Sequence, residues 1–127
     1  MIDVCLVKVP DSGLVYQNLN RFTAIEVPVW AALMADNLRK TGFSIELLDA
    51  AAEGLTLEQT AEKIKQIEAL LTVFIIYGHQ PSASTQLMPD AISSHRLLKQ
   101  ISSTKTMFLG THPASLPTET LQETEAD

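Results

Sequence analysis

The residues best suited to chemistry stand in two short segments, each of which follows an apolar run. The first segment is Gly78–Ser84 (GHQPSAS), and the second is Gly110–Ser115 (GTHPAS). Imidazole can act as an acid, a base or a metal ligand near neutral pH, and hydroxyl groups bond amide and phosphate groups. Ser82, Ser84 and Thr85 can therefore cap a following helix or bond a polar ligand at its N-terminus. The sequence leaves both roles open.

The three histidines differ in their surroundings. His79 and His112 each follow a glycine closely at the end of an apolar run, which makes both candidates for lining a ligand site, His112 before His79. His95 lies within a polar stretch of a predicted helix, so we expect a structural or incidental role and little cost when it is changed. Two histidines without a third ligand at a recognisable spacing argue against a metal site.

Several motifs are absent, and their absence excludes the corresponding chemistry. The chain has no Gly-x-Gly-x-x-Gly after its first apolar run and no Gly-x-x-x-x-Gly-Lys-Ser/Thr, so the usual dinucleotide and P-loop sites are missing. It has no Gly-x-Ser-x-Gly elbow for a nucleophilic serine. The single cysteine, Cys5, lies within an apolar run and is expected to be an inert core thiol. Trp30, at helical spacing with Leu33 and Met34, is expected to pack in the core.

Four apolar runs predict strands, and the stretches between them predict helices. The strands are expected at residues 2–9, 43–48, 72–77 and 105–109. The helices are expected to begin at Pro28, after a capping box of Thr56 and Gln59, near Thr85 and at Pro117.

This alternation predicts an α/β fold: a Rossmann-like, flavodoxin-like, doubly wound parallel sheet of order 2-1-3-4, with the fifth strand missing. Ligands of such sheets bind outside the carboxyl ends of the strands, beside the reversal of strand order. That rule brings together residues 10–27 and the two segments Gly78–Ser84 and Gly110–Ser115. A four-stranded sheet exposes an apolar flank, so we read the chain as a fragment of a longer protein, with dimerisation as the alternative.

The composition of the chain limits its size class and the kinds of partner that it can bind. The chain has 127 residues, of which 46% are hydrophobic, which is enough for the core of one domain spanning 1–127. A formal net charge of -6 disfavours nucleic acid and anionic membranes. The sequence shows no membrane-spanning run and no export signal, and a lone cysteine suits a reducing compartment. We therefore expect a cytoplasmic location.

The chain resembles, in order and over nearly its whole length, the N-terminal cobalamin-binding domain of cobalamin-dependent radical S-adenosylmethionine enzymes. The most specific part of the match is Gly-Thr-His-Pro-x-x-Leu-Pro-x-Glu-x-Leu, followed by an acidic tail that ends in Asp127. The matching residues are Val27-Pro28, 38–43 (LRKTGF), 45–50 (IELLDA), 110–117 (GTHPASLP) and 119–121 (ETL).

The resemblance implies a corrin ring held over the carboxyl edge of the sheet, with the nucleotide tail beside the sheet. Many relatives are methyltransferases, whose downstream radical domain binds S-adenosylmethionine and a four-iron four-sulfur cluster through Cys-x-x-x-Cys-x-x-Cys. Those cysteines are absent here, so this chain by itself binds the cofactor without completing the reaction. The cofactor contacts implied by position are Ser82, Ala83, Ser84, Thr85, Gly110, Thr111, His112 and Pro113.

Two points qualify these assignments. The Asp-x-His-x-x-Gly motif that places a histidine under cobalt in other cobalamin proteins is absent, so His112 is not assigned to the metal. Gly110, without a Cβ, either lets the backbone approach a flat ring closely or only permits a turn with positive φ. The alternative function is an interaction or regulatory module that kept the flavodoxin-like fold and lost the ligand.

Overall fold

The computed structural model describes residues 1–10, 26–78 and 81–127, with side chains from residue 83 onward in the last range. Most of the segment 10–27 and all of His79 therefore lie outside the described residues, as does the side chain of Ser82. The elements are β1 (Val4–Lys8), α1 (Val29–Lys40), β2 (Ile45–Asp49), α2 (Leu57–Ile67), β3 (Leu71–Ile76), α3 (Pro81–Ile101), β4 (Lys105–Gly110), α4 (Thr111–Ser115) and α5 (Pro117–Thr124).

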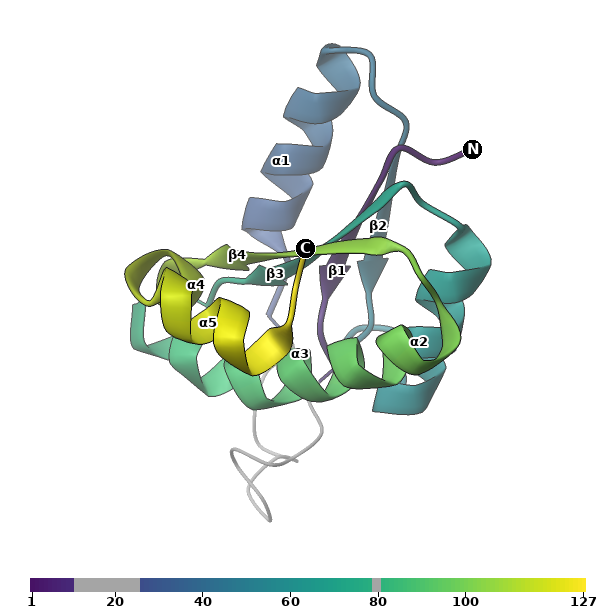
Figure 1. Ribbon diagram of the computed structural model, residues 1–127. Helices are drawn as coiled ribbons and strands as arrows, with labels where there is room; N and C mark the ends of the chain where they lie inside the picture. Colours follow the sequence, from purple (N-terminus) through teal and green to yellow (C-terminus); the bar gives the residue numbers. More distant parts are fainter. Residues whose placement is uncertain (11–25, 79–80) are drawn as a thin grey trace.

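The strands form one parallel sheet in the order β2-β1-β3-β4, which confirms the predicted doubly wound α/β fold. Helix α1 covers one face of the sheet, and α2 and α3 cover the other (Figure 1). In β3, Phe74 and Ile76 point into the core on the side of α2 and α3, whereas Val73 and Ile75 face α1. Burial on both faces confirms that β3 is a central strand.

Local sequence signals account for several element boundaries. The capping box is formed at α2: the Gln59 N–H donates to Thr56 Oγ1 over 3.2 Å, and the Thr56 N–H donates to Gln59 Oε1 over 2.9 Å. Gly42 ends the turn after α1 with φ of 101°, a left-handed conformation that glycine adopts without steric cost. Within the described residues, none of the helices has the length and apolar character needed to cross a membrane.

Two helices depart from the predicted boundaries. Helix α3 begins at Pro81 rather than near Thr85, because proline suits the first turn of a helix, where its missing N–H has no partner to lose. The segment after β4, predicted as a loop, folds into the short helix α4. Pro113 falls within the first turn of α4 and so leaves its hydrogen bonds intact.

The expectation that Trp30 packs in the core is wrong. Its side chain is 53% exposed and Leu33 is 57% exposed, because Ala31 and Ala35 form the side of α1 that meets the sheet. The Trp30 ring instead packs against Tyr77, with ring centroids 5.7 Å apart.

The structural role expected for His95 agrees with the structure, but its expected place on a polar helix face is wrong, and its burial conflicts with the small cost expected when it is changed. His95 is 1% exposed and belongs to the buried stripe of α3, at helical spacing with Ala91 and Leu98. The polar residues on either side of it in the sequence concealed this stripe. Cys5, by contrast, is fully buried as expected, and burial raises the pKa of its thiol to about 12.

Candidate functional site

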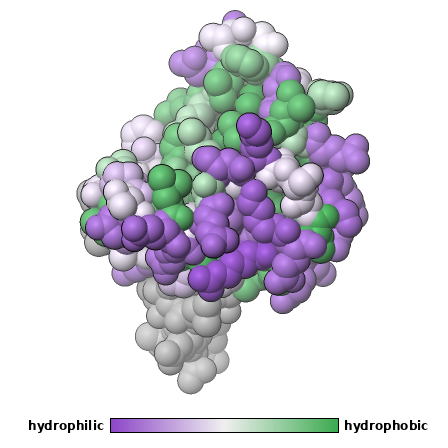
Figure 2. All heavy atoms as spheres, viewed as in Figure 1, coloured by the Kyte–Doolittle hydropathy of each residue, from purple (hydrophilic) through white to green (hydrophobic). Residues whose placement is uncertain are grey.

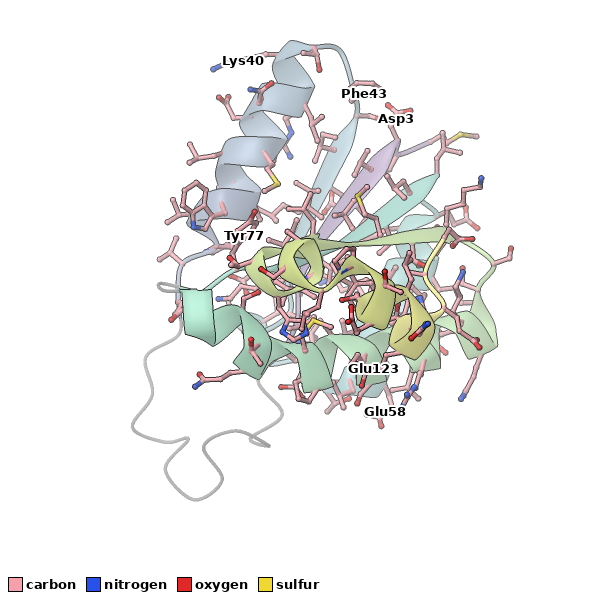
Figure 3. All side chains as sticks on the ribbon, turned by 60° about the vertical axis from the view of Figure 1, so that its left-hand side comes forward. Asp3, Lys40, Phe43, Glu58, Tyr77 and Glu123 are labelled. Carbon is pink, nitrogen blue, oxygen red and sulfur yellow. The ribbon has the colours of Figure 1, made fainter. Side chains whose placement is uncertain are left out.

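The carboxyl ends of the four strands define one edge of the sheet, here called the carboxyl edge, at Lys8, Asp49, Ile76 and Gly110. Strand order reverses between β1 and β3, which is where sheets of this type bind ligands. Tyr77 marks this edge, at the far end of the sheet from Asp3 and Phe43 (Figure 3).

Ser84 connects three elements at the carboxyl edge. Its side chain is fully buried, and its hydroxyl donates to the Ile76 carbonyl over 2.5 Å. The same oxygen accepts the His112 N–H over 3.0 Å. The Ser84 hydroxyl therefore links the first turn of α3 to the end of β3 and to the start of α4.

Thr85 and His112 form a second link between α3 and α4. Thr85 Oγ1 lies 3.0 Å from His112 Nδ1, which leaves Nε2 of the half-buried imidazole as its second polar atom. Thr111 is half-buried beside it, and Pro113 is buried. The structure thus brings together Ser84, Thr85 and His112, as the sequence predicts.

Glycines at this edge are required by close packing within the protein. A Cβ on Gly110 would lie 2.1 Å from the Ile76 carbonyl oxygen, so the backbones of β3 and β4 need a glycine here. Its φ of 165° is extended, so the alternative explanation of this glycine, a turn with positive φ, is wrong. A Cβ on Gly78 would lie 2.2 Å from the Cβ of Ala83, so Ala83 packs directly on the chain leaving β3.

A lysine at the end of β1 was not found by reasoning from the sequence. Lys8 Nζ lies 3.6 Å from Asp49 Oδ1 and donates to the Glu26 carbonyl, and the two charged side chains are only 14% and 17% exposed. Lys8 also lines a small cavity of about 50 Å³ with Trp30 and Tyr77. One feature of the sequence could have revealed this ion pair. Lys8 lies within an apolar run that predicts a buried strand, and a buried lysine rarely lacks a partner of opposite charge.

A larger groove runs along the face of the sheet that carries α1. This α1 groove has a volume of about 510 Å³, and Figure 2 shows hydrophobic residues gathered in the upper half of the molecule, where Figure 1 places α1. It is the apolar flank that a four-stranded sheet was expected to expose. Its lining includes Leu6, Trp30, Met34, Val73, Met107 and Leu109.

The fold and the carboxyl edge define the class: a doubly wound α/β protein with a polar cluster at the carboxyl ends of β3 and β4 and an apolar groove along the sheet. No protein-family model, curated protein or solved structure matched the chain. Among the residues that the structure describes, no group of three or more His, Cys, Asp or Glu side chains is arranged to hold a metal ion.

Proposed function

We propose that the chain is the cobalamin-binding domain of a cobalamin-dependent radical S-adenosylmethionine enzyme of the methyltransferase type. One observation carries the proposal. The segment with the most specific resemblance, 110–117, begins at the last residue of β4, beside the end of β3 and on the edge where doubly wound sheets bind ligands.

The hydrogen-bonding side chains at the carboxyl edge suit the corrin ring of cobalamin, and the apolar α1 groove suits its nucleotide tail. The corrin ring is flat and carries amide side chains, which hydroxyl and imidazole groups such as those of Thr85, Thr111 and His112 can bond. The nucleotide tail ends in a planar, largely apolar base, for which Leu6, Val73 and Leu109 supply apolar walls in the α1 groove. When bound, the cofactor would supply a transferable methyl group.

The remaining chemistry is assigned to another part of the same protein. With a single cysteine, the 127 residues cannot hold an iron–sulfur cluster by the usual three-cysteine motif. In this proposal S-adenosylmethionine and the four-iron four-sulfur cluster belong to a radical domain outside these residues, in a cytoplasmic enzyme.

Retention of colour during gel filtration tests the proposal. The purified chain is mixed with hydroxocobalamin and is expected to elute with corrin absorbance. Met107→Glu places a charge in the α1 groove at a side chain that is 44% exposed, and should weaken binding at least tenfold, about 1.4 kcal/mol. Leu121→Glu is the matched control: Leu121 is 52% exposed on α5, outside the groove lining, and this variant should bind like the wild type.

The second candidate is an interaction or regulatory module of flavodoxin-like fold without a ligand. It is favoured by the internal use of polar groups at the carboxyl edge, where Ser84, Thr85 and His112 bond one another and the end of β3. A folded wild-type chain that stays colourless would overturn the cobalamin proposal and leave this candidate.

A further inference from the structure

A buried histidine packs edge-to-face against a stacked pair of phenyl rings on the α3 side of the sheet, those of Phe74 and Phe108, whose centroids lie 5.1 Å apart. The ring centroid of His95 is 5.8 Å from that of Phe74 and 5.3 Å from that of Phe108, in edge-to-face arrangements. Its Nε2 lies 3.0 Å from Thr106 Oγ1. Nδ1 is buried without a hydrogen-bond partner among the described residues. Within the described part of the chain, the imidazole thus has one polar connection, through Thr106.

Thr106 in turn holds the last residue of the chain. Thr106 Oγ1 donates to Asp127 Oδ2 over 3.2 Å, and its backbone N–H donates to the same oxygen over 3.0 Å. The Asp127 N–H donates to the Thr106 carbonyl over 3.1 Å, and Lys99 Nζ donates to Oδ2 over 2.8 Å. Figure 1 shows the C-terminus in front of β4. Asp127 therefore covers the backbone groups of Thr106 on the edge of β4 that faces away from β3.

The direction of these bonds sets the state of the imidazole. A threonine hydroxyl has one hydrogen, and here it is given to the Asp127 carboxylate, so the hydroxyl oxygen accepts from His95 Nε2–H. Nδ1 is then the bare nitrogen, where a further proton must bind. That proton would create a charged, unpartnered N–H on a ring that packs against two phenyl rings, which is costly in a buried site.

We propose that His95, Thr106 and Asp127 form a pH-sensitive latch, in which protonation of His95 releases the segment 125–127 from β4 and uncovers the outer edge of that strand. The protonated ring must reach water, and its departure removes the bond that orders the Thr106 hydroxyl toward Asp127. By the alternation of a parallel strand, the backbone groups of Phe108 face the same edge as those of Thr106. An uncovered edge of this kind can pair with another strand.

The charged groups around His95 support this assignment. Burial lowers the pKa of His95, and Lys99 and Arg96 on α3 lower it further, against the opposing effects of Asp127 and Glu125 from the C-terminal segment. The sheet residues that contact His95, namely Phe74, Phe108 and Thr106, are uncharged.

The pH range of the latch follows from two groups. Bonds from Lys99 and Thr106 lower the pKa of Asp127 to about 2, so its carboxylate stays ionised between pH 5 and 7.5. Only His95 changes charge within the latch in that range. In the open state the imidazole of His95 reaches water and has the ordinary pKa of about 6.5. In the closed state burial lowers that pKa. The latch is therefore closed above about pH 6.5, and opening increases up to tenfold per pH unit below it.

Amide hydrogen exchange of Thr106, measured by NMR between pH 7.5 and 5 and expressed as a protection factor, tests the proposal. In the wild type, protection is expected to fall by up to tenfold per pH unit below about pH 6.5, while the Phe74 amide in the sheet centre keeps its protection. His95→Gln keeps a donor and removes the titration, so protection should be independent of pH. His112→Gln removes a different histidine and should respond like the wild type.

Three results would overturn the latch: constant protection of Thr106 in the wild type, an equal fall at Phe74, or an unchanged pH response in His95→Gln. Should His95→Gln fail to fold, the imidazole of His95 in the wild type is titrated directly by NMR. A pKa at or above 6.5, with Thr106 protection unchanged across that titration, would equally refute the proposal.

Discussion

Replacing Gly110 with alanine is expected to destabilise the folded chain severely. The added Cβ would lie 2.1 Å from the Ile76 carbonyl oxygen, 2.7 Å from its carbon and 3.0 Å from the Ile76 Cβ. Two of these atoms belong to the backbone of the central strand and cannot rotate away. The pair Ile76 and Gly110, which closes the ladder between β3 and β4, must therefore separate. Overpacking of about 1–3 kcal/mol, together with a strained or lost ladder bond of about 1 kcal/mol, predicts a loss of about 3 kcal/mol.

Urea denaturation followed by circular dichroism measures this loss. With a slope of about 2 kcal/mol/M, a loss of about 3 kcal/mol moves the midpoint down by about 1.5 M. Gly54→Asn is the matched control, because a Cβ there meets no atom within 4 Å and asparagine tolerates the left-handed φ of 65°. A midpoint for Gly110→Ala as close to the wild type as that of the control would refute the close approach of the two strands. Because of the same contact, a substitution at Gly110 cannot test ligand binding separately from the fold.

The remaining predictions concern buried or capping side chains. Ile76→Ala should lower the free energy of unfolding by about 2–5 kcal/mol in urea denaturation, because the side chain is fully buried on the central strand. His95→Ala should cost about 2–4 kcal/mol by the same measurement, since it leaves a cavity beside two stacked phenyl rings; an unchanged midpoint would contradict its burial. Thr56→Ala removes the helix cap of α2 and should lower stability by about 1 kcal/mol, seen as a lower thermal midpoint with the fold retained. Cys5, whose pKa burial raises to about 12, should resist iodoacetamide at pH 8 until the chain is unfolded in urea, and fast labelling of the native protein would show an accessible thiolate.

Much of the fold could be predicted because its signals are local. The continuous apolar run in β3 indicates a strand covered on both faces, and the structure buries Phe74 and Ile76 completely. The capping box at Thr56 and Gln59 needs only a spacing of three residues, so it is visible without any tertiary knowledge. The doubly wound parallel sheet followed from the alternation of elements and the handedness of crossovers, and the order 2-1-3-4 followed from the flavodoxin-like type of such sheets.

The location of the candidate site could be predicted from the sequence, whereas the roles of its residues could be predicted only in part. Parallel strands bring their carboxyl ends to one edge, which is why the segments after β3 and β4 could be expected to meet and why Ser84 and His112 do so. That the Ser84 hydroxyl would be buried and shared between Ile76 and His112 depends on where α3 begins, and helix ends are weakly encoded in sequence. Cobalamin and its contacts stay a prediction.

The sequence by itself determined the alternation of strands and helices, the α/β class, the buried thiol of Cys5 and the edge where the polar segments meet. Only the tertiary structure decided the rest. Gly110 is needed because it meets a carbonyl 34 positions earlier in the chain, and His95 is buried because Phe74 and Phe108 close around it from two strands. Trp30 is exposed because the side of α1 that meets the sheet is set by Ala31 and Ala35. Each of these outcomes depends on contacts between residues distant in the chain, and periodicity within one segment carries no information about such contacts.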